Sequence, residues 1–535
     1  MNLKIYLISV IIFCLSISRV FSATVVITPS GTSDDTNLIQ TALDGLHAGD
    51  TLLLNGDFIH KKTIYLVSDF TWILNGTLTL AKNSASMLDD YGLRYDGFDN
   101  SRETAIATRE GAKNINFSGG IIYGNGDFNG RPTGLPRVRQ VNMVFAEDCY
   151  FHDFTVEDAS DDCFTLGAAS HHNKVERVIG RHAGGKVEKD GGNALTDVGH
   201  HNTWIDCIAD QGGSDGWTPK CQNSTFIRCI ASNNMGPGFG MYAREEGYSN
   251  NRDVGAHIIG NQFIDCVAYG SIKSAGFSFD ISSNCPGAII RDNFIQAVCY
   301  DNQGSGVMFR NKDDAETGII KDNVVDIVCY GNNGLTGKGN DNSWAGGLGM
   351  ENDNSSTHNL IESVTGSVIC FENKIDVNTR GGHNCNIIVY HPDEEREPKL
   401  DDKSSGNNTV TVIDFNCSDE LNEWCQQKYC SLFNDTTVTA VFTNTRNLHP
   451  SYSLSQNYPN PVNTTTSIEY TIPRRSYVSL KVFDLSGREL ATLVNAKKPE
   501  GQYKVEFNRA NLPSGTYFYR LHAGNFAEAK KIVLK

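Results

Sequence analysis

A repeat of about 22 residues runs through the middle of the chain and constrains the fold more than any other sequence feature. Aligned on a small residue followed by an apolar one, seven five-residue segments recur between residues 163 and 351. Their last residues are 30, 23, 22, 38, 30 and 41 positions apart, so the longer intervals contain inserted loops. The segments end at Gly167, Asp197, Lys220, Tyr242, Asp280, Arg310 and Glu351. A period of this length predicts stacked units, each in contact with its neighbours.

Each repeat has the pattern of a β-strand with one buried face. Residues 276–280, for example, alternate small or polar residues with Phe277 and Phe279. A second apolar run follows several segments, at residues 226–231, 263–268 and 294–299. The corners carry amides that suit left-handed turns and stacked side chains: Asn202, Asn223, Asn261, Asn293 and Asn323. We therefore predict an all-β fold, a right-handed parallel β-helix, which is a solenoid of stacked strands.

The start of the repeat region predicts a capped solenoid. Residues 33–36 precede an amphipathic stretch at 38–43, which Gly45 ends, as in a short cap helix. Early coils follow at residues 49–54, 77–80 and 115–126. Over about 400 residues this sequence resembles the pectin-lyase-like superfamily of polysaccharide lyases, polysaccharide hydrolases and mannuronan epimerases. The resemblance implies the fold, and in kind it is closest to the β-helical alginate lyases and mannuronan epimerases.

The N-terminus predicts export. Residues 1–22 combine Lys4 with an apolar stretch from Ile5 to Ile17 and a small residue, Ser22, at the expected cleavage site. The apolar stretch is too short for a membrane anchor, so we expect no membrane span in the mature protein.

The C-terminus resembles an export signal of a different kind. Residues 454–535 alternate polar and apolar residues between turn signals, which predicts a small antiparallel β-sandwich. The motifs at 454–461, 482–487 and 513–521, followed by a basic end, resemble the type A C-terminal sorting domain of the type IX secretion system. The resemblance implies the secretion machinery as a partner and an extracellular or outer-membrane surface location. A carbohydrate-binding sandwich is the alternative.

These features divide the chain into four parts. We expect a signal peptide at 1–22, a β-helical catalytic domain at 23–441, a linker at 442–453 and the sorting domain at 454–535. With 46 basic and 62 acidic residues, the net charge of −16 argues against nucleic acid as a partner. An anionic polysaccharide must then be bound by a local basic cluster. We expect the protein to act as a monomer.

The cysteines test the solenoid prediction. Cys207, Cys229 and Cys266 align at one position of the repeat, so we expect them to stack as small core residues. Export permits disulfides, yet residues stacked on successive coils point the same way and need not bond. Cys417, Cys425 and Cys430 lie in an acidic, helix-like segment, where a disulfide is more plausible.

The last residue of each segment is expected to project outward and to form a column along one face. This column contains Asp197, Lys220, Tyr242, Asp280 and Arg310, and two positions further along lie Gln222, Arg244 and Lys312. Adjacent coils are about 4.8 Å apart, so Lys220, Tyr242 and Arg244 fall within the reach of one sugar residue. A charged solenoid face can also serve solubility alone. A column that combines acid, amine, phenol and guanidinium nevertheless favours a catalytic site.

The chemistry that fits this column is β-elimination on a uronate polymer. Arg244 or Arg310 would bind the C6 carboxylate. Lys220 would take the C5 proton, oriented by Asp197, and Tyr242 would protonate the glycosidic oxygen, or the two would exchange roles. The remaining charged and polar residues would bind substrate: Arg310, Asp280, Gln222, Lys312 and His201. The pairs His171-His172 and His200-His201 are expected at corners, with His201 at the groove edge.

Hydrolysis is a rival reaction. Asp161-Asp162 resembles the paired aspartates of β-helical polygalacturonases, but the other motifs of that family are missing. Inverting hydrolysis requires two carboxyl groups about 6.5–9.5 Å apart. In the predicted column, Asp197 and Asp280 are three coils apart, or about 14 Å, which is too far.

Epimerisation and calcium-dependent elimination are further alternatives. Residues 216–220 resemble the Gly-Phe-Asp-Pro-His segment of mannuronan epimerases, with Thr218 and Lys220 in place of the aspartate and the histidine. Residues 215–220 also resemble a segment of calcium-dependent pectate lyases, whose double-aspartate motif is missing from the next coil. We therefore expect no required cofactor, with Ca²⁺ possible at Asp-rich loops.

The leading hypothesis is a secreted polysaccharide lyase that acts on an anionic, uronate-containing glycan. Alginate is favoured over pectate because the calcium motif is missing. A C5-epimerase, a polygalacturonase-like hydrolase and a non-catalytic glycan-binding or adhesin solenoid remain the alternatives.

Overall fold

A computed structural model describes most of the chain from residue 22 to residue 534. In the first part it covers residues 22–415, with gaps at 90–101, 109–111, 130–134, 168, 186–190, 244–256, 282–286, 312–317, 333–345, 353–360, 372–376, 379–381, 393–399 and 402–407. In the second part it covers 453–534, with gaps at 455–456, 458–459, 461, 463, 473–475, 484–488, 499–500, 510–511, 514 and 524–525. The chain divides into two compact units, Met1–Ser431 and Leu432–Lys535.

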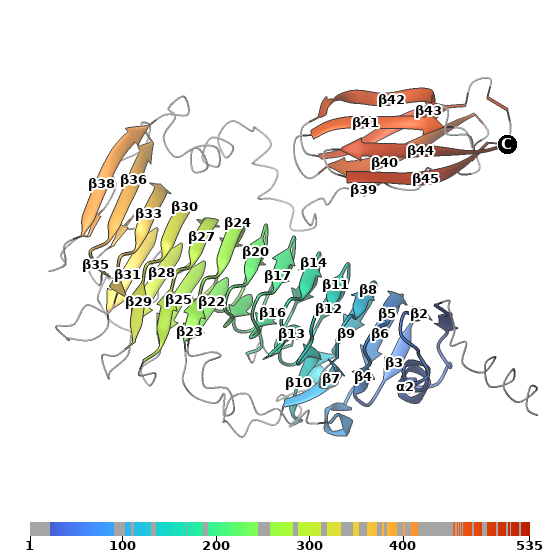
Figure 1. The fold of residues 1–535 in the computed structure, drawn as a ribbon, viewed down its shortest axis with the longest axis horizontal. Helices are drawn as coiled ribbons and strands as arrows, with labels where there is room; N and C mark the ends of the chain where they lie inside the picture. The colour runs from blue at the N-terminus through green and yellow to red at the C-terminus, as the bar shows by residue number, and fades with distance from the viewer. Residues whose placement is uncertain are drawn as a thin grey trace, which may run out of the picture. The chain divides into compact units, whose positions relative to one another are not determined.

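The first unit is the predicted right-handed parallel β-helix (Figure 1). One of its walls is a 12-stranded parallel sheet with one strand per coil. Its strands in chain order are β4 (Ile64–Leu66), β7 (Arg102–Thr108), β10 (Arg137–Met143), β13 (Phe164–Leu166), β16 (Leu195–Asp197), β19 (Trp217–Pro219), β22 (Phe239–Ala243), β25 (Phe277–Ile281), β28 (Val307–Asn311), β31 (Leu348–Asn352), β34 (Val377–Asn378) and β37 (Leu400–Asp401). The segments of the sequence repeat form this wall.

A 21-stranded parallel sheet forms most of the remaining wall. In its first part each coil contributes two short strands separated by a corner. These are β1 (Thr24–Ile27), β2 (Thr51–Asn55), β3 (Phe58–His60), β5 (Thr71–Asn75), β6 (Thr77–Leu80), β8 (Asn116–Ser118), β9 (Ile121–Tyr123), β11 (Tyr150–His152), β12 (Thr155–Glu157), β14 (Lys174–Glu176), β15 (Ile179–Arg181), β17 (Thr203–Ile205), β18 (Ile208–Asp210), β20 (Thr225–Ile227) and β21 (Ile230–Ser232).

From β24 (Gln262–Tyr269) onward, one long strand replaces the two short ones. β24 pairs with both β20 and β21, and its register with the following strand shifts between Phe263 and Cys266. The later strands are β27 (Phe294–Tyr300), β30 (Val324–Tyr330), β33 (Thr365–Phe371), β36 (Asn386–Pro392) and β38 (Thr409–Phe415). A five-stranded parallel sheet appears on the same coils, formed by β23 (His257–Ile259), β26 (Ile289–Arg291), β29 (Ile319–Lys321), β32 (Ile361–Glu362) and β35 (Gly382–His383).

A short helix packs at the N-terminal end of the solenoid, as predicted. α2 (Thr36–Asp44) begins after Asp35 and ends at Gly45, and it buries Ile39 and Leu43 in the core. Two 3₁₀ turns, η1 (Ala85–Met87) and η2 (Gly126–Phe128), are the other helical elements of the described residues. In the described part of the chain no helix combines the length and the apolar character that a membrane crossing requires.

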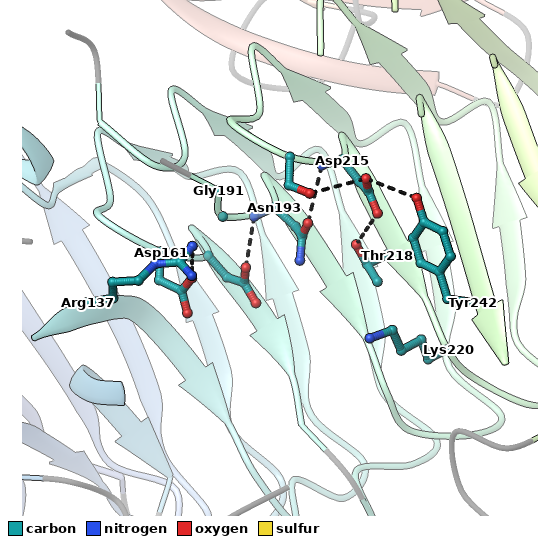
Figure 2. Close-up of a pocket in the computed structure, with 11 residues that line it drawn as sticks. Arg137, Asp161, Gly191, Asn193, Asp215, Thr218, Lys220 and Tyr242 are labelled. Carbon is teal, nitrogen blue, oxygen red and sulfur yellow. Dashed lines mark hydrogen bonds and ion pairs between the residues drawn. The ribbon is translucent and has the colours of Figure 1, made fainter. Parts of the chain in front are cut away.

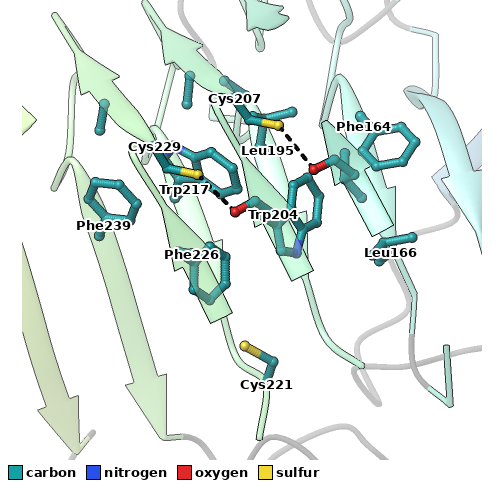
Figure 3. Packing of buried hydrophobic residues seen from close by; sticks show 14 of the residues in the cluster. Phe164, Leu166, Leu195, Trp204, Cys207, Trp217, Cys221, Phe226, Cys229 and Phe239 are labelled. Carbon is teal, nitrogen blue, oxygen red and sulfur yellow. Dashed lines mark hydrogen bonds between the residues drawn. The ribbon is translucent and has the colours of Figure 1, made fainter. Parts of the chain in front are cut away.

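Aliphatic and cysteine side chains fill much of the core, and within it aromatic rings stack from coil to coil (Figure 3). The rings of Trp217 and Phe239 are nearly parallel at 5.6 Å, and those of Phe226 and Phe263 at 4.8 Å. Such ring pairs add about 0.5–1.5 kcal/mol each to the free energy of burial. The side chains that alternate with them point outward and are therefore available for a site.

Cysteines and asparagines behave as the repeat predicts. Cys207, Cys229 and Cys266 are fully buried, and the ten buried cysteines of the described residues form no disulfide. Cys417, Cys425 and Cys430 lie outside the described residues. Buried amides form a ladder at one corner, where Asn261 Nδ2 donates to Asn293 Oδ1 at 3.2 Å and Asn293 Nδ2 donates to Asn323 Oδ1 at 2.9 Å.

The second unit contains two antiparallel sheets around its own apolar core. One is formed by β39 (Ser453–Leu454), β40 (Thr465–Ile472) and β43 (Gly501–Asn508). The other is formed by β41 (Ser476–Phe483), β42 (Glu489–Lys498), β44 (Gly515–Ala523) and β45 (Phe526–Leu534). The predicted small sandwich at the C-terminus is thus confirmed.

Candidate functional site

A pocket of about 220 Å³ lies against the outer face of the 12-stranded sheet (Figure 2). It is built from the coils that carry β10, β13, β16, β19 and β22. Its eleven lining residues are Arg137, Asp161, Asp162, Gly191, Gly192, Asn193, Ser214, Asp215, Thr218, Lys220 and Tyr242. Lys220 and Tyr242, the two residues at the centre of the predicted site, therefore share one pocket.

Three consecutive coils place equivalent side chains at the edge of this pocket through a short repeated pattern, Asp/Asn-x-x-Thr. The pairs are Asp162 with Thr165, Asn193 with Thr196, and Asp215 with Thr218. In the first and third pair the threonine hydroxyl donates to the aspartate Oδ2, at 3.4 and 3.2 Å. The pattern holds each carboxylate at the start of its strand.

The same column is linked from coil to coil through backbone amides. The N–H of Asn193 donates to Asp162 Oδ1 at 2.8 Å, and the N–H of Asp215 donates to Asn193 Oδ1 at 3.3 Å. The next residue in the column is Pro237, because β19 and β22 pair Trp217 with Phe239. Proline has no N–H, so the ladder cannot continue from Asp215 in this way.

Tyr242 contacts the carboxylate of Asp215 at the point where the ladder ends. Its hydroxyl donates to Asp215 Oδ1 at 3.3 Å. Gly240 makes room for this contact, because a Cβ there would overlap Asp215 Oδ2 and lie 2.7 Å from Tyr242 Cε2. Figure 2 shows the phenol and the carboxylate side by side at one end of the pocket.

Lys220 is the cation nearest to this pair in the lining of the pocket. Its side chain is half-buried and forms no hydrogen bond or ion pair with any described residue. It follows β19, one coil before Tyr242. An ammonium or amine in this position can interact with a bound ligand without breaking an existing contact.

The other end of the pocket is held by buried ion pairs. Arg137 Nη2 lies 2.6 Å from Asp161 Oδ1, and Arg139 Nε lies 3.7 Å from Asp161 Oδ2 and 3.8 Å from Asp162 Oδ2. Gly191 has a φ of +77°, and a Cβ there would lie 2.7 Å from Arg137 Nη2. Glycine therefore lets the guanidinium reach the pocket wall.

The prediction that Asp197 projects outward beside Lys220 is wrong. Asp197 is fully buried, and it accepts hydrogen bonds from Trp204 Nε1 at 2.8 Å, Gly199 N at 2.9 Å and Asn202 Nδ2 at 3.0 Å. The strands pair Asp197 with Leu166 and with Pro219, one position away from the alignment used for the sequence. A shift of one residue in a strand moves a side chain to the opposite face. Burial raises the pKa of Asp197, which is a structural residue of the core.

Arg310, Asp280, Gln222 and His201 do not line the pocket. Arg310 is paired with Asp280 on the preceding coil, and Tyr242, Asp280 and Arg310 are adjacent in the predicted column. Gln222 pairs with His200 in a ladder at a corner, and His201 is exposed at the same corner. Their roles in substrate binding stay predictions.

Arg244 and Lys312 lie outside the described residues, so their predicted roles also stay predictions.

The carboxylates that line the pocket were not predicted as site residues from the sequence. Asp161 and Asp162 were interpreted as a motif of hydrolases, and Asp215 as part of a segment that resembles calcium-dependent pectate lyases. The Asp/Asn-x-x-Thr pattern on three successive coils was the signal that would have placed Asp162, Asn193 and Asp215 in one column. Arg137 has no such signal, because its position depends on an ion pair with Asp161 on the next coil.

No three His, Cys, Asp or Glu side chains among the described residues converge as they would around a metal ion. The pocket carboxylates are instead occupied by Arg137, Arg139, Tyr242 and threonine hydroxyls. The possibility of Ca²⁺ at Asp-rich loops stays a prediction.

Comparisons with known proteins support the predicted fold of the first unit and the predicted sorting domain of the second. Residues 456–535 match the family model of the secretion system C-terminal sorting domain. No curated protein sequence matches the chain.

Among solved structures, the A-module of the mannuronan C-5 epimerase AlgE6 of Azotobacter vinelandii is similar with a TM-score of 0.50. The two are 13% identical, over 72% of this chain and 96% of the epimerase module. A family 28 exopolygalacturonase of Yersinia enterocolitica has a TM-score of 0.33 at 11% identity, over 74% of this chain and 79% of the other. The surface adhesin PfbA of Streptococcus pneumoniae has a TM-score of 0.41 at 15% identity, over 72% of this chain and 87% of the adhesin.

These findings confirm the predicted fold and the predicted route of export. The similarity to the epimerase module confirms the parallel β-helix fold of the first unit. The sorting domain shows that the protein is exported by the type IX route to the cell surface or beyond it. The chain is therefore a secreted parallel β-helix protein that carries a type IX C-terminal sorting domain.

Proposed function

We propose that this protein is a secreted polysaccharide lyase that cleaves a uronate-containing glycan by β-elimination in the pocket around Lys220 and Tyr242. The observation that carries the proposal is the composition of this pocket. The pocket contains the amine of Lys220, which has no side-chain partner among the described residues. It also contains the phenol of Tyr242, which donates a hydrogen bond to Asp215. Alginate is the favoured substrate and pectate the next.

β-Elimination needs a base for the C5 proton and an acid for the leaving glycosidic oxygen. Lys220, in its neutral form, takes the C5 proton, and Tyr242 gives its hydroxyl proton to the leaving oxygen. Tyr242 is suited to the acid role because its O–H is present and oriented by Asp215 at 3.3 Å. The proton gained by Lys220 balances the one lost by Tyr242, and exchange with solvent restores both groups.

Elimination also needs a positive charge at the C6 carboxylate, since the carbanion formed at C5 is stabilised by that neighbour. Arg137 supplies it in this proposal. Its guanidinium faces the pocket, and one of its nitrogens already binds Asp161, which leaves further N–H donors for a ligand carboxylate. Asn193, between Arg137 and Lys220 in Figure 2, adds an amide to the wall.

Product analysis of the secreted protein tests this function. We expect absorbance from an unsaturated uronyl product on alginate, or on pectate, within a panel of acidic polysaccharides assayed with and without a chelator. Lys220→Ala and Tyr242→Phe are each expected to lower turnover at least 100-fold, because each removes one proton-transfer group. Lys321→Ala and Tyr300→Phe are matched controls in other sheets and should keep full activity.

Two outcomes would contradict the lyase proposal. Full activity of both pocket variants would place the site elsewhere. A change of uronate composition without chain cleavage would show a C5-epimerase, which shares the proton abstraction but not the departure of the glycosidic oxygen.

Hydrolysis is the second candidate, and one observation favours it. Asp162 and Asp215 occupy equivalent positions two coils apart in the same pocket. At about 4.8 Å per coil their backbones are about 9.6 Å apart, close to the upper limit of the carboxyl separation in inverting glycosidases. New reducing ends without an unsaturated product, abolished by Asp162→Asn or Asp215→Asn, would establish hydrolysis. Binding without any turnover would indicate a glycan-binding solenoid.

A further inference from the structure

Two His-His pairs lie next to each other at a corner of the solenoid, apart from the pocket. His171-His172 and His200-His201 occupy equivalent positions on adjacent coils, and a parallel bridge joins His171 to His200. His172 and His201 are exposed and have φ values of +56° and +55°. In this left-handed conformation the second ring of each pair turns back toward the first.

The rings of each pair are hydrogen-bonded through the same type of nitrogen, so one Nδ1 of each pair donates, and that ring would carry its proton on Nε2 instead when a metal binds. His171 Nδ1 lies 2.9 Å from His172 Nδ1, and His200 Nδ1 lies 2.9 Å from His201 Nδ1. Within each pair the rings are nearly perpendicular, at 88° and 89°. Between coils the equivalent rings stack, with centroids 5.0 and 5.4 Å apart.

This geometry points to a binding site for a divalent copper or nickel ion on each His-His pair. Imidazole nitrogens bind such metals at about 2.0–2.1 Å. Two nitrogens 2.9 Å apart then subtend an angle of about 90° at the metal, as in neighbouring positions of a square-planar or tetragonal complex. A tetrahedral ion would need the nitrogens about 3.3 Å apart, so the arrangement favours Cu²⁺ and Ni²⁺ over Zn²⁺.

Each pair provides two ligands, and water would occupy the other positions. No third His, Cys, Asp or Glu side chain among the described residues completes either pair. The imidazoles must be neutral to bind a metal.

Two Cu²⁺ ions on stacked pairs would lie about one coil spacing apart and repel each other. We therefore expect one ion to bind first and the second to bind more weakly.

Copper titration of the full mature protein tests this site. We expect Cu²⁺ binding at pH 7 with electron paramagnetic resonance parameters of a tetragonal ion and hyperfine coupling to two nitrogens. In the double variant His172→Asn/His201→Asn the affinity should fall at least tenfold. Asparagine keeps the left-handed backbone conformation, so the corner should remain folded.

A control variant separates this site from other histidines. His47→Asn removes an exposed imidazole that lies near Asp50 and far along the chain from the pairs. It should bind Cu²⁺ as the unaltered protein does, and circular dichroism should show that both variants are folded. Equal Cu²⁺ affinity of the folded double variant and the unaltered protein, or a spectrum without nitrogen coupling, would overturn the proposal.

Discussion

Replacing Trp204 by phenylalanine measures what one buried hydrogen bond contributes to the stability of the solenoid. Trp204 is fully buried, and its Nε1 donates to Asp197 Oδ2 at 2.8 Å. Asp197 is fully buried as well, and burial raises its pKa. Loss of a hydrogen bond to a charged group costs about 1.5–3 kcal/mol, in addition to the loss of packing that follows any Trp→Phe change.

Trp72 offers a matched control for the packing loss. It is also fully buried in the 21-stranded sheet and stacks on Phe117 at 5.1 Å, as Trp204 stacks on Phe226 at 6.2 Å. Its Nε1 has no hydrogen-bond partner among the described residues. Trp72→Phe therefore removes the same part of the ring without removing a hydrogen bond. We expect Trp204→Phe to lower the free energy of unfolding by at least about 0.5 kcal/mol more than Trp72→Phe, and by about 1.5–3 kcal/mol more where Asp197 is ionised.

The difference between the two variants should depend on pH. Because the folded-state pKa of Asp197 is raised, its protonation stabilises the fold at low pH, and this contribution is lost as the pH rises through the folded pKa. Once Asp197 is protonated, the hydrogen bond from Trp204 is a neutral one, worth about 0.5–1.5 kcal/mol. The extra loss in Trp204→Phe is thus larger at a pH above the folded pKa of Asp197 than at a pH below it.

Urea unfolding followed by circular dichroism, at pH 7 and at pH 4, measures the difference in destabilisation between the two variants and its dependence on pH. Equal destabilisation of the two variants at pH 7 would refute the assignment of Asp197 to the core. If Asp197 pointed outward, as the sequence alignment implied, replacing Trp204 would remove no hydrogen bond to its carboxylate.

Three further predictions concern the pocket and the N-terminal coils. Gly240→Ala should lower turnover at least tenfold while substrate binding persists, because the added Cβ separates Asp215 from Tyr242; steady-state kinetics would show a changed kcat. Pro237→Ala supplies an N–H that competes for the Asp215 carboxylate, so we expect reduced kcat with a nearly unchanged unfolding midpoint. His60 is buried, and burial lowers its pKa from 6.5 to about 4, so protonation of the unfolded chain should remove stability as the pH falls from about 6.5 to 4. Over this pH range the unaltered protein should lose about 3 kcal/mol of unfolding free energy relative to His60→Gln, as measured by urea unfolding. A difference between the two proteins that does not change with pH would contradict the lowered pKa of His60.

The fold was predictable because its determinants are local and repeated. Alternation of apolar residues in segments such as 276–280 defines a strand, and the repeat of that segment defines the stacking. The outward direction of Lys220 and Tyr242 followed from the same alternation, and the structure places both in the pocket. Buried Cys207 and Cys229 likewise followed from their shared position in the repeat.

The site was less predictable because it depends on register and on contacts between coils. The segment ending at Asp197 was aligned one residue away from its true register, which reversed the direction of that side chain. Both alignments place a small residue before an apolar one, so the sequence pattern alone did not distinguish them. The contact between Asp215 and Tyr242 joins residues 27 positions apart and requires Gly240 between them, which no local pattern encodes.

The pocket lies where the repeated hydrogen-bond ladder of the solenoid stops. Asp162 and Asn193 each use a side-chain oxygen to accept the N–H of the next coil, as a structural column would. Asp215 has the same position, but Pro237 gives it no N–H to accept, and its carboxylate orients the Tyr242 hydroxyl instead. A single proline thus ends the ladder at the carboxylate that, in the mechanism we propose, orients the proton donor Tyr242.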